Sequence, residues 1–280
     1  MNKFLPIYFG GRKIIMSTTL KCKDIASVIE RLAPKSLAYD WDNVGLLCGD
    51  EEQSVKKILL TLDLDMGVVN EAVELGAQMI VSHHPIMFKP VNKITEQTPT
   101  GRLLRALIKN NISFYAAHTN LDIAKGGLND LLAKKLCLND VRVLEYTNDE
   151  GEGIGRIGNA AAPITLGELA NQIKKALGVD YLRYSGDTNS YVSKIALNTG
   201  GGTSLIGAAL DANADVFITG DYKYSQIRDC VENGMNIIDV GHYDTEFIVC
   251  ELFESYLSEQ FGASVELVKT KANKNVMQFI

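Results

Sequence analysis

The sequence lacks most of the features that would assign it at once to a class. Its five cysteines, in 280 residues, are scattered and include no C-x-x-C pair, which argues against a disulfide framework and against a thiolate zinc site. No apolar run reaches the roughly 18 residues that a membrane helix needs. With 28 Lys and Arg against 34 Asp and Glu, the net charge is −6, and nucleic-acid binding normally needs a basic excess. We therefore expect a cytoplasmic protein with reduced thiols, no membrane segment and no nucleic-acid partner.

The first fifteen residues also lack the marks of a working targeting signal. The stretch MNKFLPIYFGGRKII contains three basic residues, but its apolar part is short and no small-residue cleavage site follows. Met16 then opens a segment typical of the start of a domain. We interpret residues 1–15 as a leader or an alternative start.

Short covered strands alternate with helical patterns along the first half of the chain. The apolar run KKILLTLDL is followed by the helical pattern MGVVNEAVELGA and then by a second run, QMIVSHHP. The alternation continues through TGRLLRALIKNN, ISFYAAHTNLD and GGLNDLLAKKLCL. This pattern predicts an α/β fold with a parallel sheet covered on both faces. The glycine-rich and acidic stretch 147–163 predicts an internal boundary.

The second half of the chain repeats this pattern. Residues 194–221 align without gaps on residues 57–84, and each copy continues into a helix and another strand that ends in His-x-x-x-carboxylate. We predict two related α/β lobes, the first of residues 16–145 plus 235–280 and the second of residues 146–234. The alternative is a chance likeness between two βαβ units, which share a hydrophobic pattern in any case.

All four histidines follow predicted strands, at the sheet edge where α/β proteins bind ligands. Two of them are adjacent, and each of the other two is followed four residues later by an acid. The six candidates are His83, His84, His118, Asp122, His242 and Glu246. Imidazole and carboxylate donors without thiolates suit zinc, iron, manganese or cobalt. Six donors exceed what one ion requires, so we predict two ions, with Glu246 as the bridging acid.

Two other motifs give weaker signals. Gly200, Gly201 and Gly202 lie between a strand and a helix, where bare amides can bind a phosphate of a substrate; a tight turn without a ligand explains them equally well. The segment YDWDNVGLLCGD contains the only tryptophan, Trp41. We interpret this segment first as packing and a turn, with a role in a site as the alternative.

The motifs WDNVGL, SHHP, HTNLD and GHYDTE, in this order and at these separations, resemble those of the GTP cyclohydrolase 1 type 2 homologue family. Its members are also described as dinuclear-metal-centre proteins that form toroidal hexamers. The resemblance covers residues 20–280 and implies two related α/β lobes with a two-metal site between them. It also implies a homo-oligomer, a hexameric ring.

Matching motif by motif, the resemblance also implies a role for each candidate. His83 and His84 would each bind one ion, Asp122 would join the first ion and His242 the second, and Glu246 would bridge both. His118 would lie beside the metals and would support the ligands or transfer protons, rather than bind an ion itself. The catalytic residues would thus be His118 and Glu246.

The resemblance implies a metal-dependent hydrolase that opens the imidazole ring of the guanine in GTP or acts on a related nucleotide. One alternative is a metal-binding hexameric scaffold, regulator or metallochaperone without turnover. A weaker alternative is a two-metal phosphoesterase, because paired ions cleave phosphate esters readily.

Overall fold

The computed structural model describes residues 6–9, 12–15 and 19–278, which fall into two compact units. Unit 1 runs to Asn120 and resumes at Val249–Val276, and unit 2 is Leu121–Ile248 together with the last residues of the chain, from Met277. The predicted leader lies partly outside the described residues; within it, β1 (Pro6–Phe9) and β2 (Arg12–Ile15) pair in an antiparallel hairpin. In the described part of the chain, no helix has both the length and the apolar character needed to cross a membrane.

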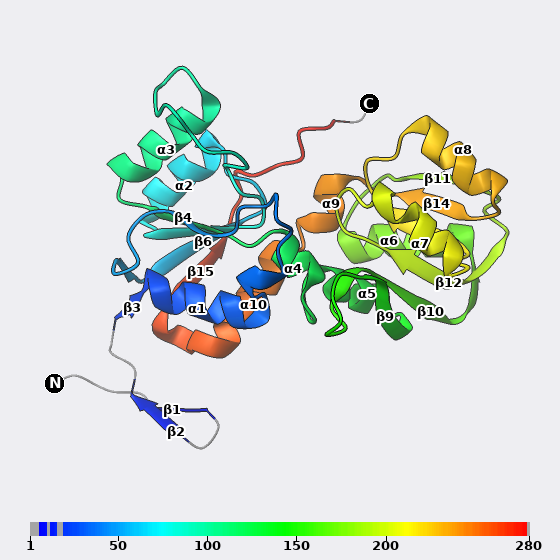
Figure 1. Cartoon of the computed structure of the whole chain (residues 1–280), viewed down its shortest axis with the longest axis horizontal. Coiled ribbons are helices and arrows are strands. Elements are labelled where there is room, and N and C mark those ends of the chain that lie inside the picture. Colours follow the sequence, from blue (N-terminus) through cyan, green and yellow to red (C-terminus); the bar gives the residue numbers. More distant parts are fainter. Residues whose placement is uncertain (1–5, 10–11, 16–18, 279–280) are drawn as a thin grey trace. The chain divides into compact units, whose positions relative to one another are not determined.

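Unit 1 is a five-stranded sheet, in the order β15-β6-β7-β8-β4, with helices on both faces (Figure 1). Its strands are β4 (Gly45–Cys48), β6 (Lys57–Thr61), β7 (Met79–Ser82), β8 (Ser113–Ala116) and β15 (Glu266–Lys269). Its helices are α1 (Cys22–Leu32), α2 (Met66–Leu75), α3 (Pro99–Lys109) and α10 (Val249–Phe261). A two-stranded sheet of β3 (Leu20–Lys21) and β5 (Ser54–Val55) and two short 3-10 turns, η1 (Lys35–Leu37) and η3 (Gly262–Ser264), complete it.

The packing of the core of unit 1 explains why its strands are apolar and why its helices each have an apolar side. Leu59, Ile80 and Phe114, from three successive strands, are fully buried against the apolar sides of α2 and α3, as the covered strands of a parallel sheet require. Helix α2 begins where the Asp65 carboxylate accepts a hydrogen bond from the Val68 amide at 2.8 Å, an ordinary N-cap.

Unit 2 is a six-stranded sheet, in the order β11-β14-β13-β12-β10-β9. Its strands are β9 (Asn139–Tyr146), β10 (Gly153–Thr165), β11 (Arg183–Ser185), β12 (Tyr191–Leu197), β13 (Val216–Thr219) and β14 (Asn236–Asp239). Its helices are α4 (Thr119–Ile123, which begins in unit 1), α5 (Leu128–Lys135), α6 (Leu166–Leu177), η2 (Thr203–Leu205), α7 (Ile206–Asp211), α8 (Tyr224–Glu232) and α9 (His242–Glu246).

The predicted internal repeat is confirmed by strand order and register. In each unit three successive strands, β6-β7-β8 and β12-β13-β14, lie parallel in the same order. Ile58 pairs with Met79 and Ile195 pairs with Val216, which are the pairs of positions that the gap-free alignment equates. Each third strand then leads into a short helix, α4 or α9, that belongs to a His-x-x-x-acid motif.

The predicted boundary within 147–163 is wrong. Residues 147–152 form the turn between β9 and β10, two paired strands of one sheet. The glycines of this stretch allow close strand contact: a Cβ on Gly153 would lie 2.1 Å from the carbonyl oxygen of Glu145. The predicted lobe limits, after residues 145 and 234, would separate β9 from β10 and β14 from β13. The units instead divide after Asn120 and after Ile248.

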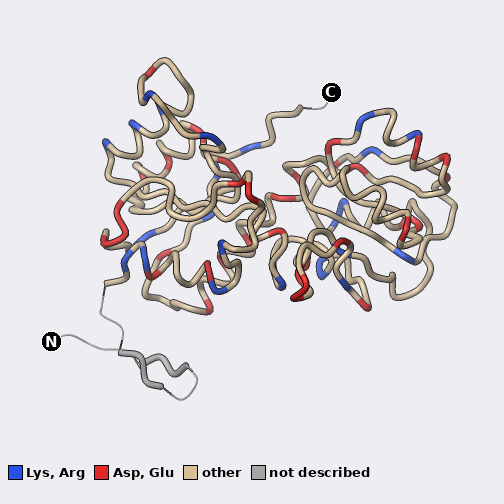
Figure 2. The backbone as a smooth tube through the Cα atoms, in the orientation of Figure 1, with Lys and Arg blue, Asp and Glu red and all other residues tan. Residues whose placement is uncertain are grey.

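Positive and negative side chains are interspersed along both units (Figure 2). On α8, for example, Arg228 pairs with Glu232 one turn later at 2.6 Å. Mixed charges of this kind are typical of a solvated helix surface. The absence of a nucleic-acid partner stays a prediction from the composition.

Candidate metal centre

Three histidines meet at the carboxyl ends of two neighbouring strands in unit 1. His83 and His84 follow β7, and His118 follows β8, which lies parallel to β7. A ring nitrogen from each can be chosen so that all three lie within 4.8 Å of one another, and the ring centroids are 5.1–5.4 Å apart. This three-histidine cluster exists because parallel strands bring their carboxyl ends to one edge of the sheet.

In each of the three rings, Nδ1 lies at hydrogen-bonding distance from an oxygen atom. The contacts are His83 Nδ1 to the Ala117 carbonyl at 2.8 Å, His84 Nδ1 to Asp63 Oδ1 at 2.7 Å, and His118 Nδ1 to Asp42 Oδ1 at 2.9 Å. When Nδ1–H donates to such an oxygen, the lone pair of a neutral imidazole is on Nε2. This is how histidine ligands are oriented in metal proteins.

The Asp42 carboxylate is buried, and its oxygen atoms accept hydrogen bonds from other groups of the protein. It accepts hydrogen bonds from the Thr119 amide at 3.0 Å and from the Thr119 hydroxyl at 2.5 Å, besides its contact with His118. Burial raises the pKa of Asp42, but the bonds from His118 and Thr119 outweigh it and lower the pKa to about 2. Asp42 is therefore ionised at neutral pH and fixes the orientation of the His118 ring.

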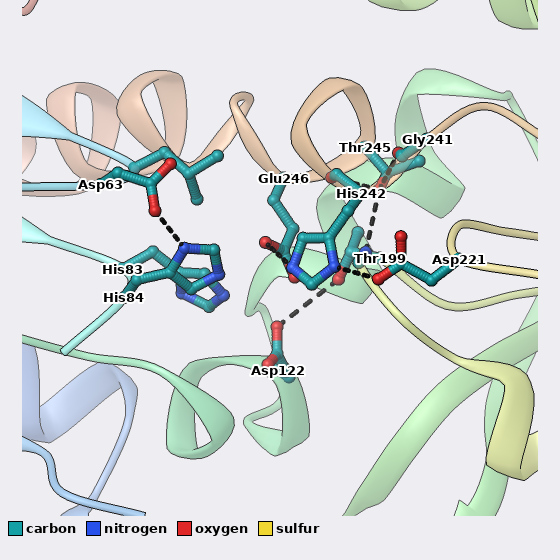
Figure 3. A network of polar contacts seen from close by, with 12 residues as sticks. Asp63, His83, His84, Asp122, Thr199, Asp221, Gly241, His242, Thr245 and Glu246 are labelled. Atoms are coloured by element: carbon teal, nitrogen blue, oxygen red, sulfur yellow. Dashed lines mark hydrogen bonds and ion pairs between the residues drawn. The ribbon is translucent and has the colours of Figure 1, made fainter. Parts of the chain in front are cut away.

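Unit 2 supplies further candidate donors: His242 and Glu246, which contact each other and which we call the His242–Glu246 cluster, and Asp122, which the turn after β12 links to them. His242 Nε2 lies 3.0 Å from Glu246 Oε2, and His242 Nδ1 lies 2.8 Å from Asp221 Oδ2 (Figure 3). Burial lowers the pKa of His242, but the two carboxylates outweigh it and raise the pKa to about 9. The cluster therefore favours positive charge at the position of the His242 ring, as a cation site should.

The turn after β12 holds this cluster together. Thr199 Oγ1 donates to Asp122 Oδ1 at 3.5 Å (Figure 3), and the Gly200 amide donates to Thr245 Oγ1 at 2.8 Å. A Cβ on Gly200 would lie 1.9 Å from Glu246 Oε1. A glycine is therefore needed here so that the Glu246 carboxylate can lie against the turn.

The amides of the glycine run are largely engaged within the protein. The Thr199 amide donates to Asn129 Oδ1 at 2.9 Å, and the Gly202 amide donates to Thr219 Oγ1 at 2.8 Å, while the Gly200 amide is bonded as described above. Within the run, Gly200 lies against the Glu246 carboxylate. A substrate-binding role for Gly200, Gly201 and Gly202 stays a prediction.

Sequence reasoning missed the carboxylates that orient the histidines. Asp63 and Asp221 each lie two residues beyond a strand, β6 and β13. The sequence did contain a signal, because the internal alignment places Asp221 opposite His84 and so at the same kind of strand end. Asp42 lies next to Trp41 in the sequence, but its bond to His118 joins residues that are 76 positions apart along the chain.

The donors present fit a divalent transition-metal ion. They are imidazole nitrogens and carboxylate oxygens without thiolates, and the rings are oriented by oxygen atoms as metal-bound histidines are. The structure also adds a finding to the sequence prediction. His118 belongs to the three-histidine cluster itself, so its position is compatible with a ligand role as well as with proton transfer.

Comparison with known proteins identifies the relatives of the chain. The family model for DUF34/NIF3 (NGG1p interacting factor 3) matches residues 20–276. A GTP cyclohydrolase 1 type 2 homolog from Clostridium perfringens is 41% identical over 262 residues, covering 93% of this chain and 100% of the relative.

Solved structures agree with this match. A Bacillus cereus protein related to NIF3 has a TM-score of 0.88 at 27% identity, covering 94% of this chain and 100% of that one. The Staphylococcus aureus protein SA1388 has a TM-score of 0.85 at 30% identity, covering 93% of this chain and 99% of that one. The α/β fold predicted from the sequence is thus confirmed, but its sheets are mixed rather than wholly parallel, because β4, β9, β10 and β11 pair antiparallel with their neighbours. The chain belongs to the DUF34/NIF3 family.

Proposed function

We propose that this protein is a metal-dependent hydrolase with a dinuclear centre. One observation carries the proposal: all four histidines have Nδ1 held by an oxygen acceptor at 2.7–2.9 Å. A single such contact is common for a structural histidine. Four of them, all beyond the carboxyl ends of parallel strands, form the pattern of oriented metal ligands.

The two clusters together offer more donors than one ion takes. The proposed ligands are His83, His84, Asp122, His242 and Glu246. In the proposed centre, as the family resemblance implies, His83 and Asp122 would hold one ion, His84 and His242 would hold the other, and Glu246 would be shared. The count of donors and the family resemblance support this assignment. Zinc, iron, manganese and cobalt all suit the donor set.

Divalent ions in such a centre supply Lewis acidity for attack of water on a polarised substrate bond. The residues of the chain supply the proton transfer. His118 is held at Nδ1 by ionised Asp42, so its Nε2 can accept a proton from the attacking water and return it to the leaving nitrogen. Asp42 keeps the ring in the orientation that this exchange requires.

The name of the Clostridium perfringens relative, a GTP cyclohydrolase 1 type 2 homolog, supports a nucleotide substrate. The proposed reaction is hydrolytic opening of the imidazole ring of guanine in GTP or a related nucleotide. A homohexamer is part of the proposal, supported by the resemblance. So is a cytoplasmic location, supported by five cysteines that form no disulfide.

The direct test is the metal content of protein purified without added metal. We expect about two ions per chain in the wild type and a sharp fall in His84→Ala and in Glu246→Ala, because each removes a proposed ligand. A wild-type protein that neither retains metal nor takes it up would overturn the proposal. Turnover of GTP is then measured with two assays, one for opening of the imidazole ring and one for release of phosphate. Retained metal without either product would favour a non-enzymatic metal-binding role, and phosphate release alone a phosphoesterase.

The orienting carboxylates give a second prediction. Asp63→Asn should weaken metal binding by roughly 10-fold or more, because the amide is a poorer acceptor for His84 Nδ1–H than the carboxylate at 2.7 Å. The matched control is Asp65→Asn, in the same loop, because asparagine caps α2 as well as aspartate does. Metal affinity is measured by competition with a chelator. Equal affinities in the two variants would contradict an orienting role for Asp63.

A further inference from the structure

Two large aromatic side chains are exposed beside the three-histidine cluster of unit 1. Trp41 is 59% exposed and Phe88 is 50% exposed. Single exposed apolar residues are ordinary, but these two lie together, with ring centroids 6.2 Å apart. Trp41 and Phe88 are 47 positions apart in the sequence. The fold therefore brings them together, not the local sequence.

Both segments are fixed by polar contacts. The Asp42 amide closes a turn on the Tyr39 carbonyl at 2.9 Å, and the Asp42 carboxylate is bound to His118 and Thr119. The Asn43 side-chain amide donates to the Met87 carbonyl at 2.7 Å, which ties the two segments together. The residues next to Trp41 and Phe88 are thus anchored while the two rings remain exposed.

The rings border the imidazole of His118. Trp41 meets it edge to face at 6.0 Å and 75°, and Phe88 does so at 5.8 Å and 65°. Tyr39 stacks on Trp41 at 5.9 Å and 20°, which supports the indole. The exposed aromatic surface is therefore adjacent to His118, the residue to which we assign proton transfer.

We infer that Trp41 and Phe88 form a stacking platform for the planar heteroaromatic ring of a substrate, which they present to His118. Stacking on fixed aromatic side chains binds flat rings without demanding a particular hydrogen-bond pattern. Because the backbone beside both rings is fixed in advance, little chain freedom is lost on binding. The inference rests on the proposed function for the role of the bound ring, but binding itself does not require the metals.

The single tryptophan of the chain allows a direct test. Guanosine monophosphate and adenosine monophosphate are titrated into the full-length protein, with and without a chelator, and the emission of Trp41 is followed. We expect saturable quenching by both nucleotides and none by ribose 5-phosphate, the ring-free control. Equal quenching by ribose 5-phosphate, or no saturable change with either nucleotide, would overturn the platform.

Variants of the second ring test its contribution. Phe88→Leu keeps apolar bulk but loses the π face, so we expect nucleotide affinity to fall by about tenfold. Phe88→Tyr should retain the affinity. Ile94→Ala, which changes another exposed apolar residue, 47% exposed, of the loop after β7, is the matched control and should also retain it. Equal affinities in Phe88→Leu and Ile94→Ala would contradict stacking on Phe88.

The outcomes separate this inference from the proposed function. Nucleotide quenching in a protein that neither retains metal nor takes it up would support the platform and overturn the dinuclear centre. Metal retention without quenching would support the dinuclear centre and overturn the platform. Without nucleotide, a blue shift of Trp41 emission at rising protein concentration, together with a lower assembly mass for Trp41→Ser, would identify the surface as a contact between copies and overturn the platform.

Discussion

The Gly200→Ala variant is expected to fold but to bind metal much more weakly than the wild type. The new Cβ would lie 1.9 Å from Glu246 Oε1 and 3.2 Å from His242 Nε2, so the Glu246 carboxylate must move away from the turn. The end of a glutamate side chain moves at little cost to the fold, but a displaced Glu246 carboxylate would no longer serve as the proposed bridging ligand. Metal affinity, measured by chelator competition, should fall by roughly 100-fold.

Gly178→Ala provides the matched control. Gly200 has a φ of +65° and Gly178 a φ of +70°, and a Cβ on Gly178 would meet nothing within 4 Å. Both variants should therefore lose about 1 kcal/mol of folding stability from the left-handed backbone. Only Gly200→Ala should lose metal. Equal metal affinity in the two variants would mean that Glu246 is not a ligand, or that it binds from another position.

The sequence predicted the repeated α/β pattern because the signals are local. The capping box is an example: the Glu168 amide donates to Thr165 Oγ1 at 3.2 Å, and the Thr165 amide donates to Glu168 Oε2 at 2.8 Å, at the start of α6. The two partners are three residues apart, so the motif can be read directly from the chain. The candidate histidines were found in the same way, because each follows a strand.

The parts that the sequence did not predict depend on distant contacts. Asp63 orients His84 from the neighbouring strand end, and Asp221 orients His242 from another. These pairs require the order and register of the strands, which hydrophobic periodicity does not supply. Trp41 was similarly interpreted as packing, whereas it is 59% exposed and contacts His118. Strand β10 was missed because its glycines, which suggest a loop, allow close contact between strands.

Arg156 is expected to be the largest single contributor to the stability of unit 2 among its charged side chains. Its side chain is only 3% exposed. It forms hydrogen bonds with Gly153 O at 2.9 Å, Gly155 O at 2.8 Å and Ala124 O at 3.2 Å, besides an ion pair with Asp130. One guanidinium thus ties β10 to the segment that follows α4.

Arg156→Met should lower the free energy of unfolding by about 3 kcal/mol, because it leaves buried carbonyls and the Asp130 carboxylate without their donor. Asp130 is 27% exposed, so water relieves part of the cost. The control is Arg228→Met: Arg228 is 60% exposed in its ion pair with Glu232, and its loss should cost about 0.5 kcal/mol or less. Urea unfolding is followed by circular dichroism, with amide exchange in β10 as the local probe.

The position of Arg156 also links stability to the proposed metal centre. Its second guanidinium nitrogen reaches the carbonyls of Ile123 and Ala124, the two residues after Asp122. Loss of these bonds frees the end of α4 before the whole unit unfolds, so Arg156→Met should release metal at a lower urea concentration than the one at which circular dichroism changes. Coincident metal release and unfolding would show that Arg156 stabilises unit 2 as a whole, without a separate effect on Asp122.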